Sequence, residues 1–142
     1  MPPPPITFDR LALPFVAEQG FEGVFGFQLL ELGRERARAR VQVTDELKQP
    51  AGLVHGGVYA SIAESLASWA TAAAIADEGK TAVGLSNQTS FMRPITDGTI
   101  HAVAICRHSG RTTWVWEVEI SDDAGRLCTL TRMTIAVRDR VG

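Results

Sequence analysis

One acidic side chain lies among small hydroxyl side chains in an otherwise apolar stretch. Glu64 is the single charged residue between positions 58 and 76. At 3.6 residues per helical turn, one polar stripe comprises Ser61, Glu64, Ser65, Ser68 and Thr71. A solvent-facing stripe ordinarily carries several long charged side chains, so this composition favours a partly buried, functional stripe. A carboxylate with no neighbouring cation suits general-base or nucleophilic work, while a structural Glu at an interface is the alternative.

The turn that precedes this stretch is His55-Gly56-Gly57. Glycines there let a substrate approach the free backbone N–H groups at the positive end of a helix dipole. Such donors can stabilise the oxyanion of an acyl-transfer transition state by about 3 kcal/mol each. The alternative is that the two glycines only make a tight turn.

The spacing of these groups has a consequence for assembly. Gly56 and Glu64 are eight residues apart, which is roughly 12 Å along a helix axis. One carbonyl group cannot contact both. If both act on one substrate, the carboxylate comes from the same helix of a second subunit, related by a two-fold axis. We therefore expect a homodimer.

The elements that must position these groups follow from the hydrophobic pattern. A long helix is predicted over 58–76 and a short one over 11–19, ended by Gly20. Strands are predicted over 24–32, 34–43, 81–91, 99–107, 112–121 and 127–137. Within 34–43 apolar residues alternate with Arg36, Arg38 and Arg40, which indicates a solvated sheet face rather than a binding patch. The pattern predicts an α+β fold in which one antiparallel sheet of about six strands wraps the long helix.

Length and composition exclude several classes. With 142 residues and a formal net charge of −2, we expect one domain over 11–142 and no nucleic-acid partner. Residues 1–10 are expected to be an extended proline-rich tail, and without a secretory signal the protein is expected to be cytoplasmic. Glu64 and the hydroxyl residues argue against a membrane span over 58–76. Neither the two cysteines nor His101 and His108 have metal-site spacing, so no metal is expected.

Two segments together resemble a known family. The run Gln49-Pro50-Ala51-Gly52-Leu53-Val54-His55-Gly56-Gly57 and the run Ala63-Glu64-Ser65-Leu66-Ala67-Ser68 are similar to the hotdog-fold thioesterases of the phenylacetate-degradation type. The segments 87–94 and 110–136 also resemble strands of that group. Within it, the chain looks most like the branch of 4-hydroxybenzoyl-CoA, 1,4-dihydroxy-2-naphthoyl-CoA and enterobactin-pathway proofreading thioesterases.

The resemblance implies hydrolysis of an acyl-CoA or aroyl-CoA, or of an acyl-carrier-protein thioester, without a cofactor. It assigns the polarising amide to Gly56, helped by Gly57, and positioning roles to Gln49 and His55. Glu64 of the other subunit would be nucleophile or general base, and Ser68 would hold the water or the carboxylate. The matching CoA-binding positions are Ser90, Arg93, Arg111, Thr112 and Thr113. Members of the family it resembles commonly pair dimers further, so a homotetramer is expected, with a homodimer alone as the alternative.

Two other functions compete with hydrolysis. A non-catalytic acyl-CoA-binding hotdog module would need no carboxylate on the reacting carbon, so Glu64 argues against it. Hotdog enzymes that hydrate an enoyl thioester typically have a different arrangement of Asp and His, and this sequence shows no such pair. Aromatic residues near the stripe, namely Tyr59, Trp69 and Phe91, are candidates for an acyl pocket or for the core.

Overall fold

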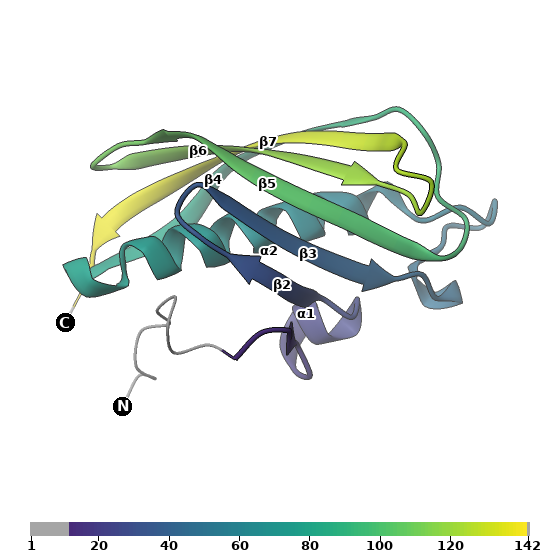
Figure 1. Cartoon of the computed structure of the whole chain (residues 1–142), viewed down its shortest axis with the longest axis horizontal. Coiled ribbons are helices and arrows are strands. Elements are labelled where there is room, and N and C mark those ends of the chain that lie inside the picture. Colours follow the sequence, from purple (N-terminus) through teal and green to yellow (C-terminus); the bar gives the residue numbers. More distant parts are fainter. Residues whose placement is uncertain (1–11, 142) are drawn as a thin grey trace.

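The computed structural model describes residues 12–141, which form one long helix and one sheet (Figure 1). The helices are α1 (Gly20–Val24), α2 (Gly56–Ala74) and the short 3₁₀ turns η1 (Asp45–Leu47) and η2 (Ala76–Glu78). The strands are β1 (Phe15–Val16), β2 (Gln28–Leu32), β3 (Arg36–Gln42), β4 (Lys80–Phe91), β5 (Thr99–Ser109), β6 (Thr113–Ser121) and β7 (Leu127–Asp139).

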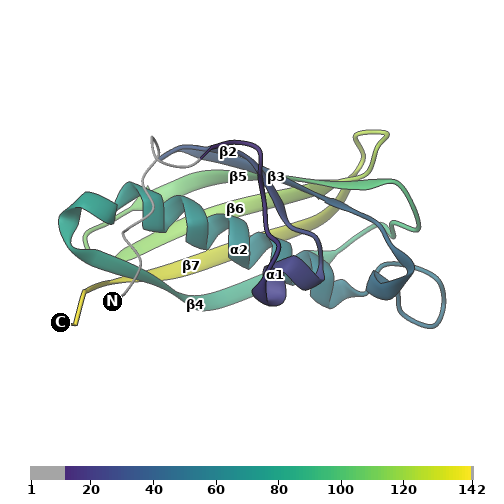
Figure 2. The same ribbon diagram turned by 90° about the horizontal axis from the view of Figure 1, so that it is seen from below.

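All neighbouring strands are antiparallel, in the order β1-β2-β3-β5-β6-β7-β4. The sheet curves along one side of α2, and Figure 2 shows the helix lying over the face of the sheet. The predicted α+β hotdog architecture is confirmed. The sheet has seven strands rather than about six, because the two-residue β1 pairs with β2 at one edge. The opposite edge is β4.

The alternating patterns in the sequence correspond to the two faces of the sheet. In β3, Ala37, Ala39 and Val41 are buried while the intervening arginines are exposed, which confirms the solvated face. In β6, Trp114 and Trp116 point into the same core. Small residues on the strand and on the helix let the two layers approach closely.

The long helix packs its apolar face on this core through Ile62, Leu66 and several alanines. It begins at Gly56 and ends at Ala74, two residues earlier at each end than predicted. The start is earlier because the His55 side chain caps the first turn. After Ala74 the chain tightens into η2 and leaves it at Gly79, whose φ of 67° is left-handed.

The helix predicted over 11–19 is wrong. Phe15 and Val16 form β1, and the first helical turn, α1, follows Gln19 instead of preceding it. Pro14 explains the difference, because a proline disfavours helical conformation at the residue before it and supplies no N–H for a helical hydrogen bond. The predicted tail over 1–10 lies outside the described residues. Within residues 12–141, no helix has the length and apolar character needed to cross a membrane.

Candidate active site

The predicted polar stripe of α2 forms one wall of a hollow of about 310 Å³, which we call the Glu64 hollow. Ser61, Ser65 and Ser68 are half-buried in it, and Glu64 is exposed rather than partly buried. The opposite walls come from α1 and β4 and contribute Phe21, Glu22 and Asn87. The structure therefore brings Glu64 and Ser68 together, one helical turn apart, as the sequence predicted.

Thr71 does not belong to this stripe, so that part of the prediction is wrong. It is fully buried, donates to the Ala67 carbonyl at 2.8 Å and accepts from Trp116 Nε1 at 2.8 Å. Ten residues after Ser61, the helix has turned this position toward the sheet. Thr71 therefore serves the core by satisfying the buried indole N–H.

The Glu64 carboxylate lies over a glycine of the edge strand. A methyl group at Gly84 would lie 3.7 Å from the carboxyl carbon of Glu64 and 3.7 Å from Met133 Cε. Among residues 12–141, no Lys, Arg or His nitrogen lies within 4.0 Å of this carboxylate. Glu64 is thus a carboxylate without a counter-ion, beside a strand position that leaves it room.

Asn87 is the nearest polar side chain from another element, and sequence reasoning did not select it. Its Nδ2 donates to the Ala60 carbonyl at 2.9 Å and lies 3.5 Å from Glu64 Oε1. Its Oδ1 accepts from the Thr89 hydroxyl at 2.7 Å, and Thr89 contacts Thr131 at 2.9 Å. This series of hydrogen bonds fixes the Asn87 side-chain amide with its N–H groups toward α2. No local sequence signal marks Asn87, because the helix groups that it contacts, Ala60 and Glu64, are 27 and 23 residues away along the chain.

The N-terminus of α2 is organised by His55. Its Nδ1 accepts a hydrogen bond from Gly57 N–H at 2.8 Å, so Nδ1 carries no proton and the neutral ring is protonated at Nε2. The backbone N–H of His55 donates to the Leu47 carbonyl at 2.9 Å, which anchors the cap to η1. Because the backbone N–H of Gly57 already donates to His55 Nδ1, it is not free to polarise a carbonyl.

The amide of Gly56 is in a different position. Within residues 12–141 no group accepts a hydrogen bond from Gly56 N–H. The Phe91 ring covers the Cα of this glycine, since a Cβ here would lie 2.9 Å from Phe91 Cε1. Gly57 is equally constrained, because a Cβ there would lie 3.0 Å from His55 Nδ1. The two glycines thus permit close packing, and one leaves a free donor at the helix terminus.

Gln49 lies in the loop between η1 and α2. Its backbone N–H donates to the Leu53 carbonyl at 2.9 Å, and its Oε1 accepts from Ala51 N–H at 3.1 Å. The side-chain amide N–H groups of this half-buried residue are therefore available as donors. Lys48 and Val54 pair across the loop, which brings the chain back to His55.

The other predicted site residues fall into two groups at opposite ends of β4. Ser90 and Arg93 lie at the Phe91 end, next to the start of α2. Arg111 lines a hollow of about 230 Å³ together with Arg34 and Lys80, at the other end. Thr112 and Thr113 adjoin Arg111 at the turn into β6. Within residues 12–141 of a single subunit, these two groups do not line a common hollow. Gly56 and Glu64 do not line one either.

The aromatic candidates have three different surroundings. Tyr59 is buried and accepts a hydrogen bond from Ile95 N–H at 3.3 Å; burial raises the pKa of its hydroxyl, which stays protonated at neutral pH. Phe91 is 59% exposed although it covers Gly56. Trp69 is half-buried and lines a second hollow beside the Glu64 hollow. Tyr59 is therefore a core residue, and Trp69 faces open space.

Comparisons with known proteins agree with this architecture. Residues 51–129 match the thioesterase superfamily. The 1,4-dihydroxy-2-naphthoyl-CoA hydrolase of Escherichia coli is 33% identical over 126 residues, 89% of this chain and 92% of that protein. The proofreading thioesterase EntH of Cronobacter turicensis is 35% identical over 112 residues, 79% and 81% of the two chains. A crystal structure of a variant of the thioesterase PA1618 from Pseudomonas aeruginosa superposes with a TM-score of 0.80 at 32% identity, covering 84% and 86%.

The wrapped helix and the site on its surface define the protein as a hotdog-fold enzyme of the thioesterase kind. The chain belongs to the thioesterase superfamily and is a thioester hydrolase, related to the CoA hydrolases and proofreading thioesterases named above. The family resemblance inferred from residues 49–68 is confirmed.

Proposed function

We propose that the protein hydrolyses an acyl-CoA or aroyl-CoA to the free acid and CoA, with Glu64 as the catalytic carboxylate. The surroundings of Glu64 in its hollow support this proposal. Glu64 has no cation within 4.0 Å among residues 12–141 and faces open space between α2 and β4. Such a carboxylate can act on a carbonyl carbon or on water, because its lone pairs are not taken up by a cation.

Two chemical routes use the same groups. In one, a Glu64 oxygen attacks the carbonyl carbon, the C–S bond breaks, and water then cleaves the resulting anhydride. In the other, Glu64 takes a proton from water as the water oxygen attacks. In both routes CoA leaves as a thiolate and is then protonated. Gly56 N–H is the donor to the developing oxyanion, with the Gln49 side-chain amide as a positioning group.

The two groups would meet in a dimer formed through the free edge of β4. This edge strand exposes Val83, Leu85 and Phe91 by 56–60%, which is unusual for a long edge strand that stays unpaired. Antiparallel pairing of two β4 strands about a two-fold axis would continue the sheet across both subunits. It would also carry the Phe91 end of one chain, with its Gly56, toward the helix α2 of the other.

The same pairing accounts for the two separated groups of predicted CoA-binding residues. Ser90 and Arg93 of one chain would approach the Lys80 end of the partner, where Arg34 and Arg111 line a common hollow. Cations and hydroxyl groups from two subunits could then bind the phosphates of one CoA. We also propose that these dimers associate further into tetramers.

A CoA-release assay with a thiol-reactive dye tests the proposal. The panel runs from acetyl-CoA and hexanoyl-CoA to palmitoyl-CoA, phenylacetyl-CoA, benzoyl-CoA and 4-hydroxybenzoyl-CoA. Glu64→Gln should lower kcat by at least about 10² without lowering the melting temperature, because the change removes the charge and keeps the shape. The matched control is Glu119→Gln on exposed β6 surface, which should leave kcat unchanged.

The assay tests the role of Glu64 and shows whether the substrate is a CoA ester or an acyl-carrier-protein thioester. A Glu64→Gln enzyme with wild-type kcat would contradict the assignment of the carboxylate. If no CoA ester is hydrolysed, the corresponding acyl-carrier-protein thioesters should be, because the thioester chemistry at the carbonyl is the same for both carriers.

A further inference from the structure

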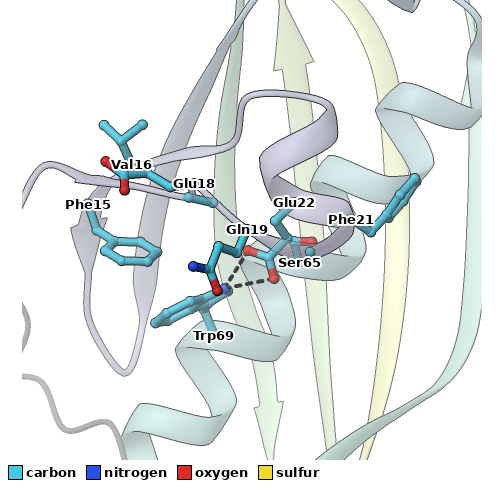
Figure 3. Close-up of a pocket in the computed structure, with 10 residues that line it drawn as sticks. Phe15, Val16, Glu18, Gln19, Phe21, Glu22, Ser65 and Trp69 are labelled. Carbon is cyan, nitrogen blue, oxygen red and sulfur yellow. Dashed lines mark hydrogen bonds between the residues drawn. The ribbon is translucent and has the colours of Figure 1, made fainter.

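A second hollow lies beside the Glu64 hollow and has no role in the proposed chemistry so far. Its volume is about 690 Å³, and it lies between the N-terminal segment 15–22 and helix α2. We call it the N-terminal hollow. Its walls combine apolar side chains of the segment and Trp69 of α2 with the polar side chains of Glu18, Gln19, Glu22 and Ser65. Figure 3 shows Gln19 and Glu22 reaching from the segment toward Trp69.

The two hollows share three lining residues. Phe21, Glu22 and Ser65 line both, and Ser65 directly follows Glu64 on α2. An acyl group whose carbonyl lies at Glu64 can therefore extend past Glu22 into the N-terminal hollow. Its volume is in the range of pockets that enclose small organic ligands. The structure thus places the N-terminal hollow directly beside the hollow of the proposed catalytic carboxylate.

Glu22 is held in place along this path. Its two carboxylate oxygens lie 2.8 and 3.1 Å from Trp69 Nε1, which donates to them (Figure 3). The indole is in turn packed against Phe15, with ring centroids 5.0 Å apart. Among residues 12–141 no Lys, Arg or His nitrogen lies within 4.0 Å of the Glu22 carboxylate.

A carboxylate accepts about four hydrogen bonds, and a single indole N–H uses a small part of this capacity. The remaining lone pairs of Glu22 are available where the two hollows adjoin. Beside the apolar side chains of Phe21 and Trp69, a fixed anionic acceptor favours a ligand that brings a hydrogen-bond donor. The same charge disfavours a ligand that brings a carboxylate to this point.

We propose that Glu22 is a specificity-determining residue that accepts a hydrogen bond from a hydroxyl group on the acyl part of the substrate. The proposal rests on the proposed thioester hydrolysis at Glu64, since it places the acyl group relative to that carboxylate. Trp69 is the positioning residue, because its N–H and its packing on Phe15 fix the Glu22 carboxylate.

The test compares substrates that differ by one hydroxyl group. We would measure kcat/KM for benzoyl-CoA and its three monohydroxylated isomers, and for hexanoyl-CoA and 6-hydroxyhexanoyl-CoA. The wild-type enzyme should prefer at least one hydroxylated substrate over its parent by about tenfold, the effect of one hydrogen bond to a charged group. Glutaryl-CoA, which ends in a carboxylate, should be a poorer substrate than hexanoyl-CoA.

The variant Glu22→Gln keeps an oxygen that accepts from Trp69 and removes the charge, so the fold is preserved. It should reduce the hydroxyl preference about fivefold, mainly by raising KM for the hydroxylated substrate. Glu18→Gln is the matched control: this exposed glutamate lies on the same segment, and its replacement should not change the preference.

Each result decides between the two proposals. If the wild-type enzyme hydrolyses the panel and Glu22→Gln leaves the hydroxyl preference unchanged, the role of Glu22 is overturned and the proposed function stands. Equal loss of preference in Glu18→Gln would also overturn it, because the effect would then come from the charge of the whole segment. If the wild-type enzyme hydrolyses no thioester, both proposals fail.

Discussion

Replacing Gly56 by proline removes the backbone N–H of this residue. Comparison with an alanine variant separates this loss from the effect of adding a Cβ. Gly56 is the first residue of α2, where a proline is well tolerated in helices. The preceding residue, His55, has φ −63° and ψ 135°, the extended conformation that a residue before proline adopts. Gly56→Pro therefore fits the backbone and removes the one N–H that the proposed mechanism requires.

The control for this variant is Gly56→Ala. Both substitutions add a Cβ that would lie 2.9 Å from Phe91 Cε1, and this exposed ring must move in both. Only the proline lacks the N–H. Loss of one oxyanion donor lowers kcat by about 10² to 10³, equivalent to about 3–4 kcal/mol. We expect a loss of this size for Gly56→Pro relative to Gly56→Ala.

The assay is steady-state CoA release on a substrate that the wild-type enzyme hydrolyses, with circular dichroism and melting temperature as checks of the fold. The two variants should have similar KM values, because the donor acts mainly on the transition state. A proline variant with kcat within threefold of the alanine variant would rule out Gly56 N–H as the oxyanion donor, because a donor that can be removed at no cost does not stabilise the oxyanion.

Two further predictions concern side chains that support the site and the core. Asn87→Ala should lower kcat about tenfold with little change in melting temperature, because this amide lies 3.5 Å from Glu64 and is half-exposed; Gln88→Ala, on the neighbouring residue, should leave kcat unchanged. Thr71→Val should lower the free energy of unfolding by about 1–3 kcal/mol, seen as a lower melting temperature, because it leaves the buried Trp116 N–H without its acceptor. An unchanged melting temperature would show that the indole finds another partner.

Much of the fold could be predicted from local patterns. The alternation in β3 and the apolar run of α2 each reflect burial of one face, and this is visible in a window of ten to twenty residues. The shared helix face of Glu64 and Ser68 was predicted in the same way, although Glu64 is exposed rather than partly buried. Thr71 was misplaced because a stripe at 3.6 residues per turn drifts around the helix, and the hydroxyl of threonine suits either a solvent face or a buried acceptor.

The contacts that join distant segments could not be predicted. Asn87 approaches Glu64, and Glu22 holds Trp69, across 23 and 47 residues of chain. Neither pairing has a local pattern, because strand register and the path of the N-terminal segment decide both. The segment itself was predicted as a helix over 11–19, although it contains Pro14, and it forms β1 instead. The cap by His55 was likewise hidden, because it depends on one rotamer.

In the proposed dimer, Glu64 and Gly56 act on one thioester from different subunits. Complementation tests it directly: the inactive variants Glu64→Gln and Gly56→Pro are co-expressed with different tags, and the mixed dimers are assayed. Random mixing gives half mixed dimers, each with one intact site of two, so activity should recover to about 25% of the wild-type value. Activity that stays at the level of the two parent variants would contradict the account, because it would place both groups in the same subunit.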